Sequence, residues 1–187
     1  MLIINSVKCS VKIPETNLKF IRSICEERSL KYCMHNNFIV IRYSSYTFTI
    51  FKKAQVIKKN KTLPSRQHAN FTTPNVYSIP CAVDLLCKIL ALVQEDKSTL
   101  LPSIDNLSAS FTLGRCIDLL AFLEHNIDAY DCISYNPETF PGLFFKIENS
   151  SSKCILFKSG KVIIVGTRSE KQLKEVYQSM IVKCVNI

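Results

Sequence analysis

The sequence is poor in the residues that usually carry catalysis or bind metals. Its 187 residues include three histidines, His35, His68 and His125, which lie far apart and without a neighbouring Cys or Ser partner. Its nine cysteines are an odd number and include no Cys-x-x-Cys pair. We therefore expect no enzyme, no metal site, no cofactor and no small-molecule substrate. Cysteines in apolar contexts should be small buried hydrophobes in a reducing compartment: Cys9, Cys25, Cys87, Cys116, Cys154 and Cys184.

Long apolar runs are also missing. The longest, Cys81 to Val93, contains Asp84 and Lys88 and is shorter than the roughly 20 residues that a bilayer needs. The N-terminus has no basic segment followed by an apolar core, so no secretory signal is expected. These absences predict neither a membrane protein nor a secreted one.

Negative charge is scarce in the first half of the chain. Residues 1–100 carry 15 Lys and Arg against 6 Asp and Glu, whereas residues 101–187 carry 9 of each. The whole excess of +9 therefore belongs to the first half. Such a balance suits an acidic partner such as nucleic acid.

The order of predicted elements repeats along the chain. In the first half we expect a strand over 2–13, a helix over 17–28, a hairpin over 38–52, a short strand over 68–73 and a helix over 81–93. In the second half we expect a strand over 104–113, a helix over 115–125, strands over 140–148, 153–159 and 161–167, and a last helix capped by Ser169. Each half thus reads strand, helix, strand, strand, strand, helix, which predicts an α+β fold with an antiparallel sheet.

The repeat also predicts the domain boundaries. We expect a first repeat over 1–97 with an inserted basic loop at about 53–67, a linker over 98–103, and a second repeat over 104–187. Between the repeats, Asn5 is matched with Asn106, Phe38 with Phe140, Phe51 with Phe157 and Thr72 with Val165.

The segment from Asn136 to Glu170 carries a more specific pattern. FPGL, a following LF, SGK, an aliphatic run and Gly166 occur here without a gap between Phe140 and Gly166. This pattern resembles the second repeat of the TATA-binding protein family, and the first half of the chain is a degenerate match to the same family. The resemblance implies two pseudo-symmetric repeats that form a saddle-shaped, curved antiparallel sheet with helices on its convex face.

The resemblance also implies a DNA-binding underside. Two phenylalanines per repeat would wedge between base steps of the minor groove, with Phe38 paired to Phe51 and Phe140 to Phe157. Asn5 and Asn106 would donate to minor-groove acceptors, and Lys146, Lys161 and Arg168 would contact phosphates. Further contacts are expected at Val7, Thr72, Pro141, Leu143, Ile155, Ile163 and Val165.

The expected partner is double-stranded DNA with an A·T-rich minor groove. Protein partners would be transcription factor IIB-like or polymerase-specific, with Glu138 at a partner-binding position. The predicted function is therefore a transcription initiation factor that bends DNA and recruits the transcription machinery. It would act in the nucleus, or at the site of viral transcription if the protein is viral.

Two other functions remain open from the sequence. The chain could be a saddle-fold protein–protein interaction module that has lost DNA bending, which acidic or bulky polar groups on the underside would favour. It could also be an accessory saddle domain of a nucleic-acid enzyme, although no catalytic pattern accompanies the repeats up to Ile187.

Overall fold

The computed structural model of the chain describes all residues except 53–54, 59–60, 65–66, 91–99, 129, 131, 148–149 and 186–187. These residues fall into two compact units. The N-terminal unit spans Val7–Ile104, and the C-terminal unit combines Met1–Ser6 with Asp105–Ile187. The first strand therefore begins in the C-terminal unit and continues in the N-terminal unit.

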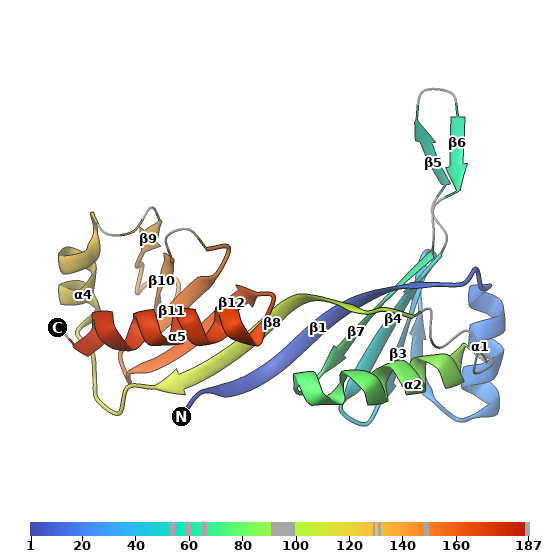
Figure 1. The fold of residues 1–187 in the computed structure, drawn as a ribbon, viewed down its shortest axis with the longest axis horizontal. Helices are drawn as coiled ribbons and strands as arrows, with labels where there is room; N and C mark the ends of the chain where they lie inside the picture. Colours follow the sequence, from blue (N-terminus) through green and yellow to red (C-terminus); the bar gives the residue numbers. More distant parts are fainter. Residues whose placement is uncertain are drawn as a thin grey trace. The chain divides into compact units, whose positions relative to one another are not determined.

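The N-terminal unit is built on an antiparallel sheet with the strand order β2-β3-β4-β7-β1; Figure 1 labels β1, β3, β4 and β7. Its strands are β1 (Ile3–Ile13), β2 (Lys31–Met34), β3 (Phe38–Tyr43), β4 (Tyr46–Phe51) and β7 (Gln67–Thr73). β5 (Gln55–Lys58) and β6 (Lys61–Pro64) pair only with each other. The basic segment predicted as a loop therefore contains a two-stranded hairpin, which corrects that prediction.

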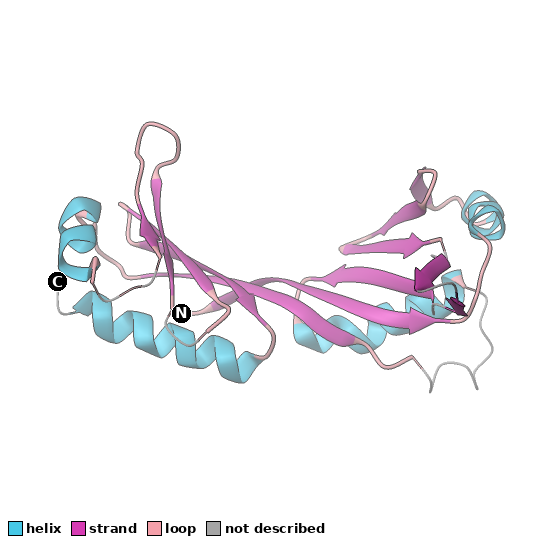
Figure 2. Cartoon of the chain, turned by 90° about the horizontal axis from the view of Figure 1, so that it is seen from above, coloured by secondary structure: helices cyan, strands magenta, loops and turns pink. Residues whose placement is uncertain are grey.

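Alternating side chains divide this sheet into a core face and an opposite face. On β1, Val7, Cys9, Val11 and Ile13 are buried, whereas the residues between them are exposed or half-buried. The same alternation of period two places Ile39, Ile41, Phe48, Ile50, Ala69 and Phe71 in the core. Figure 2 shows the strands of each unit as a layer with helices against it.

Two helices cover the core face of the N-terminal unit. α1 (Leu18–Glu27) has Asn17 as its N-cap, since Asn17 Oδ1 accepts the Lys19 backbone N–H at 2.9 Å. After a 3-10 turn at Val76–Ser78, α2 (Ile79–Ile89) follows with Pro80 in its first turn. Buried residues from both helices complete the core: Leu18, Ile21, Ile24, Cys25, Ala82, Leu86 and Cys87.

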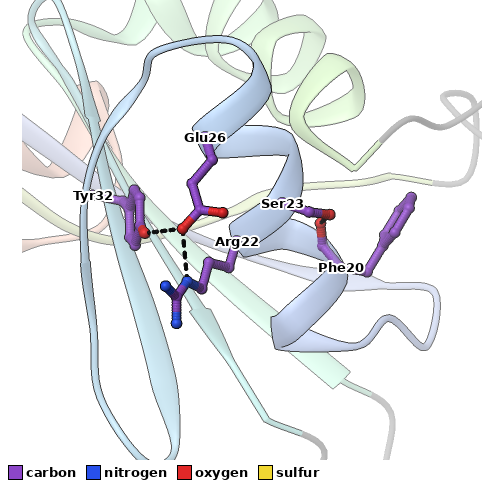
Figure 3. A network of polar contacts seen from close by, with 5 residues as sticks. All are labelled: Phe20, Arg22, Ser23, Glu26 and Tyr32. Carbon is purple, nitrogen blue, oxygen red and sulfur yellow. Dashed lines mark hydrogen bonds and ion pairs between the residues drawn. The ribbon is translucent and has the colours of Figure 1, made fainter.

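A polar network links α1 to the edge strand β2. Glu26 Oε1 accepts from Arg22 Nε at 2.8 Å and from Tyr32 Oη at 2.7 Å (Figure 3). Arg22 comes from the preceding turn of the same helix, whereas Tyr32 belongs to β2. The network therefore ties the outermost strand of this sheet to the helix beside it.

The C-terminal unit has the strand order β8-β12-β11-β10-β9, again antiparallel. Its elements are β8 (Ser103–Thr112), α4 (Leu119–Asn126), β9 (Ile133–Ser134), β10 (Gly142–Lys146), β11 (Lys153–Phe157), β12 (Lys161–Thr167) and α5 (Glu170–Val185). Asp118 caps α4 by accepting two backbone N–H groups, and Ser169 Oγ accepts the Gln172 N–H at 3.1 Å. The predicted cap of the last helix is thus confirmed.

Gly160 forms the tight turn between β11 and β12. Its φ is +78°, and a Cβ at this position would collide with the Arg115 carbonyl oxygen. Its N–H donates to the Phe157 carbonyl at 2.8 Å, and its own carbonyl accepts from Leu113 N–H at 2.9 Å. The SGK turn is therefore closed by a residue that only glycine suits, and this turn holds the end of β11 in place.

The sequence missed one short strand in each repeat. β2 and β9 precede the expected strands, so each repeat has four strands after its first helix, not counting the separate hairpin. β2 is exposed over most of its length and β9 has only two residues, so neither shows a clear alternation. Cys116 is exposed, which corrects its prediction as a buried residue.

The predicted linker over 98–103 lies partly outside the described residues, and β8 already begins at Ser103. Within the described part of the chain, no helix is long and apolar enough to cross a membrane.

Candidate nucleic-acid interface

Each unit has a sheet face opposite its core face, which we call the open face. In β7, for example, Ala69 and Phe71 are buried, whereas Asn70 and Thr72 between and beside them are half-buried. Residues that are direct partners in an antiparallel ladder point to the same face. The registers therefore give the composition of each open face row by row.

The open face of the C-terminal unit carries an apolar row. Successive cross-strand partners from β8 to β9 are Ser110, Ile163, Ile155, Phe144 and Ser134. Ile163 and Ile155 are half-buried, and Phe144 is 40% exposed. The predicted contacts Ile155 and Ile163 thus lie side by side on one accessible surface, and Phe144 extends it although the sequence analysis did not single it out.

The candidate wedge pair of this unit lies at the edge of the apolar row. The ring centroids of Phe140 and Phe157 are 5.9 Å apart, and Phe140 also packs against Phe144 at 4.8 Å. Both rings close over Gly142: a Cβ there would come within 2.6 Å of Phe140 Cε1 and 3.1 Å of Phe157 Cε1. The glycine of FPGL therefore provides the space in which the two rings meet.

In the candidate wedge pair of the N-terminal unit, the ring centroids are separated by the same distance, but the two phenylalanines are placed differently in the strand pairing. The ring centroids of Phe38 and Phe51 are again 5.9 Å apart, and the two residues are direct cross-strand partners. In the C-terminal unit the partner of Phe157 is Gly142, and Phe140 precedes β10 by two residues. The hairpin between the phenylalanines is shorter in the first repeat, which moves Phe38 into the ladder.

The rest of the N-terminal open face is mostly polar. One row contains the successive partners Ser10, Asn70, Thr49, Val40 and Cys33, which we call the polar row. The adjacent row contains Lys8, Thr72, Thr47, Arg42 and Lys31, which we call the basic row. The predicted contact Thr72 lies in the basic row.

Lys31 and Arg42 lie directly opposite each other in the basic row, and both are exposed. In the C-terminal unit, Lys146 and Lys153 are likewise direct partners and exposed. Like charges in this position repel one another. Each unit therefore holds two cations where an anion would relieve their repulsion.

Asn106 is held by a β-bulge in β12. The register between β8 and β12 shifts between Ile164 and Thr167, and Gly166 has a φ of +89°. The Gly166 N–H donates to Asn106 Oδ1 at 2.7 Å. Because a backbone N–H can only donate, this bond identifies the oxygen of the amide and leaves Nδ2 as a donor that can bind another group.

Asn5 is not the structural counterpart of Asn106. The burial alternation of β1 recurs in β8 one hundred residues later, so that Val7 corresponds to Leu107 and Ser6 to Asn106. The repeat match of Asn5 with Asn106 is therefore one residue out of step. Asn5 is exposed and accepts from Ser110 Oγ at 3.1 Å, whereas Ser6 Oγ is 2.8 Å from Ser108 Oγ.

Val7 and Leu143 were predicted as contacts, but both have 0% exposure. Their side chains belong to the core face, since every second residue of a strand points away from the open face. Lys8 is a further open-face residue, which was not among the predicted contacts. Placing Val7 in the core puts Lys8 on the open face, and the run of Val7, Cys9 and Val11 could have shown it.

The remaining predicted residues lie at the margins of the C-terminal unit. Lys161 is the exposed first residue of β12, and the backbone N–H of exposed Arg168 donates to Gln172 Oε1 at 2.8 Å at the start of α5. Val165 is half-buried and pairs with Lys153. Glu138 and Pro141 are exposed in the turn before β10.

The described residues contain no group of His, Cys, Asp or Glu that could hold a metal ion. The inner thiols are also unsuited to chemistry. Burial raises the pKa of Cys154 to about 12, with a further contribution from the nearby Cys184. Burial likewise raises the pKa of Cys184 to about 11. These thiols are therefore packing groups.

Residues 101–184 match the family model described as transcription factor TFIID (or TATA-binding protein, TBP). The chain is 33% identical over 91 residues to a TATA-box-binding protein of Pyrodictium occultum, a match that covers 49% of this chain and 43% of that protein. It is 35% identical over 71 residues to one of Sulfolobus acidocaldarius, covering 38% and 34%. The chain thus matches less than half of the length of these curated relatives.

The fold is similar over the whole chain to a solved structure of Methanococcus jannaschii TBP. The TM-score is 0.73 at 21% identity, and the match covers 100% of this chain and 99% of the other. At this identity the likeness concerns the fold, and it confirms the predicted α+β fold class.

Proposed function

Because residues 101–184 match the TATA-binding protein family model and the whole chain has the fold of a TATA-binding protein, we propose that it is a transcription factor of this family that binds duplex DNA in the minor groove and bends it. The observation that carries this proposal is the pair of phenylalanine rings in each unit, with centroids 5.9 Å apart in both. Apolar side chains that insert between base steps kink DNA toward the major groove, and the larger surface that the bent duplex presents to the protein offsets the cost of unstacking.

The cations of the open faces support a polyanionic partner. Lys31 with Arg42, and Lys146 with Lys153, are like-charge neighbours that an anionic backbone would stabilise. Phosphate contacts of this kind position a protein on the duplex without reading its sequence. Asn106 adds a donor of fixed orientation, which suits the N3 and O2 acceptors of the minor groove.

The test is a bending measurement on an A·T-rich duplex labelled at both ends, read by energy transfer. Wild type should bind with strong salt dependence and bend the duplex. Phe140→Ala combined with Phe157→Ala should retain a folded protein but lose most of the bend. Phe20→Ala is the matched control, because Phe20 is 50% exposed on α1 and outside the open face. A folded wild-type protein that binds no duplex at low salt would refute the proposal.

A second candidate function is a protein-interaction module that no longer bends DNA. The position of Phe38 favours it, because this ring lies within the ladder opposite Phe51 and is not a structural copy of Phe140. In this case the chain would bind DNA weakly or not at all, and wild type and Phe38→Ala would both leave the duplex unbent.

Recruitment of the transcription machinery is part of the first proposal. Exposed Glu138, in the turn before Phe140, is the candidate contact for a transcription factor IIB-like or polymerase-specific partner. Glu138→Arg should weaken assembly of such a partner on the DNA complex while leaving DNA binding by the chain itself unchanged.

A further inference from the structure

The open faces of the two units differ in their hydrogen-bonding capacity. At equivalent places in the two sheets, the C-terminal unit has Ile163, Ile155 and Phe144 where the N-terminal unit has Asn70, Thr49 and Val40. The two rows are aligned from their first residues, because Ser10 pairs with Asn70 in one sheet and Ser110 pairs with Ile163 in the other. The N-terminal unit adds two hydroxyls in the next row, those of Thr72 and Thr47.

This difference bears on a single chemical group of DNA. In the minor groove, A·T and T·A pairs present only acceptors, whereas a G·C pair adds the 2-amino donor of guanine. Against Ile163 and Ile155 that donor would be taken out of water without a partner, which is unfavourable. Against Asn70, Thr49, Thr47 or Thr72 it meets oxygen atoms that can accept its hydrogen.

Resting on the proposed function, we propose that the chain reads its DNA site asymmetrically. The C-terminal unit excludes guanine from the part of the groove that it covers, whereas the N-terminal unit admits it. Asn70 and Thr49 are the residues that determine this tolerance, and Ile163 and Ile155 are the residues that determine the exclusion.

The neighbouring cations are consistent with this division. The basic row places Lys8, Arg42 and Lys31 on the N-terminal open face, and their charge acts on phosphates irrespective of sequence. Lys146 and Lys153 do the same on the C-terminal open face, so the units differ in guanine tolerance through the polar and apolar rows and not through their phosphate contacts.

Inosine provides the sharpest test, because an I·C pair lacks only the 2-amino group of a G·C pair. Duplexes carrying I·C or G·C at one position at a time along an A·T-rich site would be compared by competition binding. We expect replacement of I·C by G·C to weaken binding about tenfold or more in one half of the site and less than about twofold in the other.

Exchanging residues between the polar row and the apolar row identifies which unit covers which half of the DNA site. Asn70→Ile with Thr49→Ile should make the tolerant half exclude guanine, and Ile163→Asn with Ile155→Thr should make the excluding half tolerant. Leu120→Asn is the matched control, since Leu120 is 59% exposed on α4. Each variant is first checked for cooperative thermal unfolding.

The outcomes separate the inference from the function on which it rests. Tight, salt-sensitive binding with equal sensitivity to guanine in both halves overturns the inference and leaves the proposed function in place. An asymmetric wild type whose pattern is unchanged by both exchanges overturns the assignment to these four residues. Absence of binding to every duplex, from folded protein, overturns both.

Discussion

Gly142 lies beneath both candidate wedge rings of the C-terminal unit. Its missing side chain leaves room for Phe140, Phe157 and the Ile155 methyl group, each of which would lie within 3.1 Å of an added Cβ. The residue that makes the wedge possible is therefore one without a side chain.

Gly142→Ala should displace the rings of Phe140 and Phe157. Overpacking of this kind costs about 1–3 kcal/mol of stability, and the bend angle measured by energy transfer should fall more than the affinity does. Gly114→Ala is a useful comparison, because no atom lies within 4 Å of its Cβ position, although its φ of +75° adds backbone strain. An unchanged bend in a folded Gly142→Ala protein would contradict this role of the glycine.

Asn106 has a structural contact with Gly166 and a proposed contact with DNA, and the two can be separated. Asn106→Asp retains an oxygen acceptor for the Gly166 N–H but removes the amide donor and adds a negative charge. We expect thermal unfolding close to that of wild type with a loss of DNA affinity of more than about tenfold. Asn106→Leu should lower both the stability and the DNA affinity, since leaving the Gly166 N–H unpaired costs about 1–3 kcal/mol of stability.

Wild-type affinity in Asn106→Asp would show that this amide does not face DNA. Asn5→Asp is the matched comparison, since Asn5 accepts from Ser110 at the start of β1 but is not the structural counterpart of Asn106. We expect its effect on binding to be the smaller of the two.

At the scale of elements, the edge pair β2–β3 places Lys31 opposite Arg42. Lys31→Gln should stabilise the free protein by about 0.2–1 kcal/mol, because it removes a repulsion between cross-strand neighbours. The same change should lower the salt dependence of DNA binding by about 0.9 in the slope of log affinity against log salt concentration. Lys19→Gln on α1 is the control, and an unchanged slope for Lys31→Gln would exclude a phosphate contact.

The contact of α1 with β2 should be sensitive to acid. The hydrogen bond from Arg22, followed by that from Tyr32, lowers the pKa of Glu26. A carboxyl group whose pKa is lowered in the folded state adds stability above its unfolded pKa of about 4.3, and this contribution is lost as the pH falls through the folded value.

Glu26→Gln should therefore destabilise the protein slightly at pH 7 and have less effect near pH 3. Urea unfolding of wild type and variant at both pH values measures the difference, with Glu27→Gln on the same helix as control. The effect is small because the ion pair is about half exposed, at 55% and 50% for the two side chains. An equal loss at both pH values would contradict the assignment.

At the scale of the whole molecule, the alkylation rates of the cysteine thiols measure how readily the core opens. The high pKa values of Cys154 and Cys184, about 12 and 11, follow from burial beneath the helices and sheet of the C-terminal unit. Cys33, Cys81, Cys116 and Cys132 are exposed.

Alkylation at pH 8 should therefore modify the four exposed cysteines at least about 100-fold faster than Cys154 and Cys184. Peptide mass spectrometry over time resolves each site, and denaturant should bring the rates together. Rapid alkylation of Cys154 in the native protein would mean that the C-terminal unit opens locally without unfolding as a whole.

Much of the fold could be predicted from local patterns. The alternation over β12 and the SGK turn indicated its bounds, and Asn17 and Ser169 behave as the caps that their side chains suggest. Such signals are local, because a turn, a cap or a half-buried strand is decided by residues close in sequence. The short edge strands β2 and β9 show no such local signal, and the sequence did not predict them.

By itself, the sequence determined the order of the helices and of the longer strands, the repeat, the family resemblance and the excess of cations in the first half. Only the tertiary structure decided which side chains share a face. It moved Val7 and Leu143 to the core, matched Ser6 with Asn106, and aligned Asn70 and Thr49 with Ile163 and Ile155. The reason is that a shift of one residue in a strand reverses the face of every side chain, and register is set by pairing between distant segments.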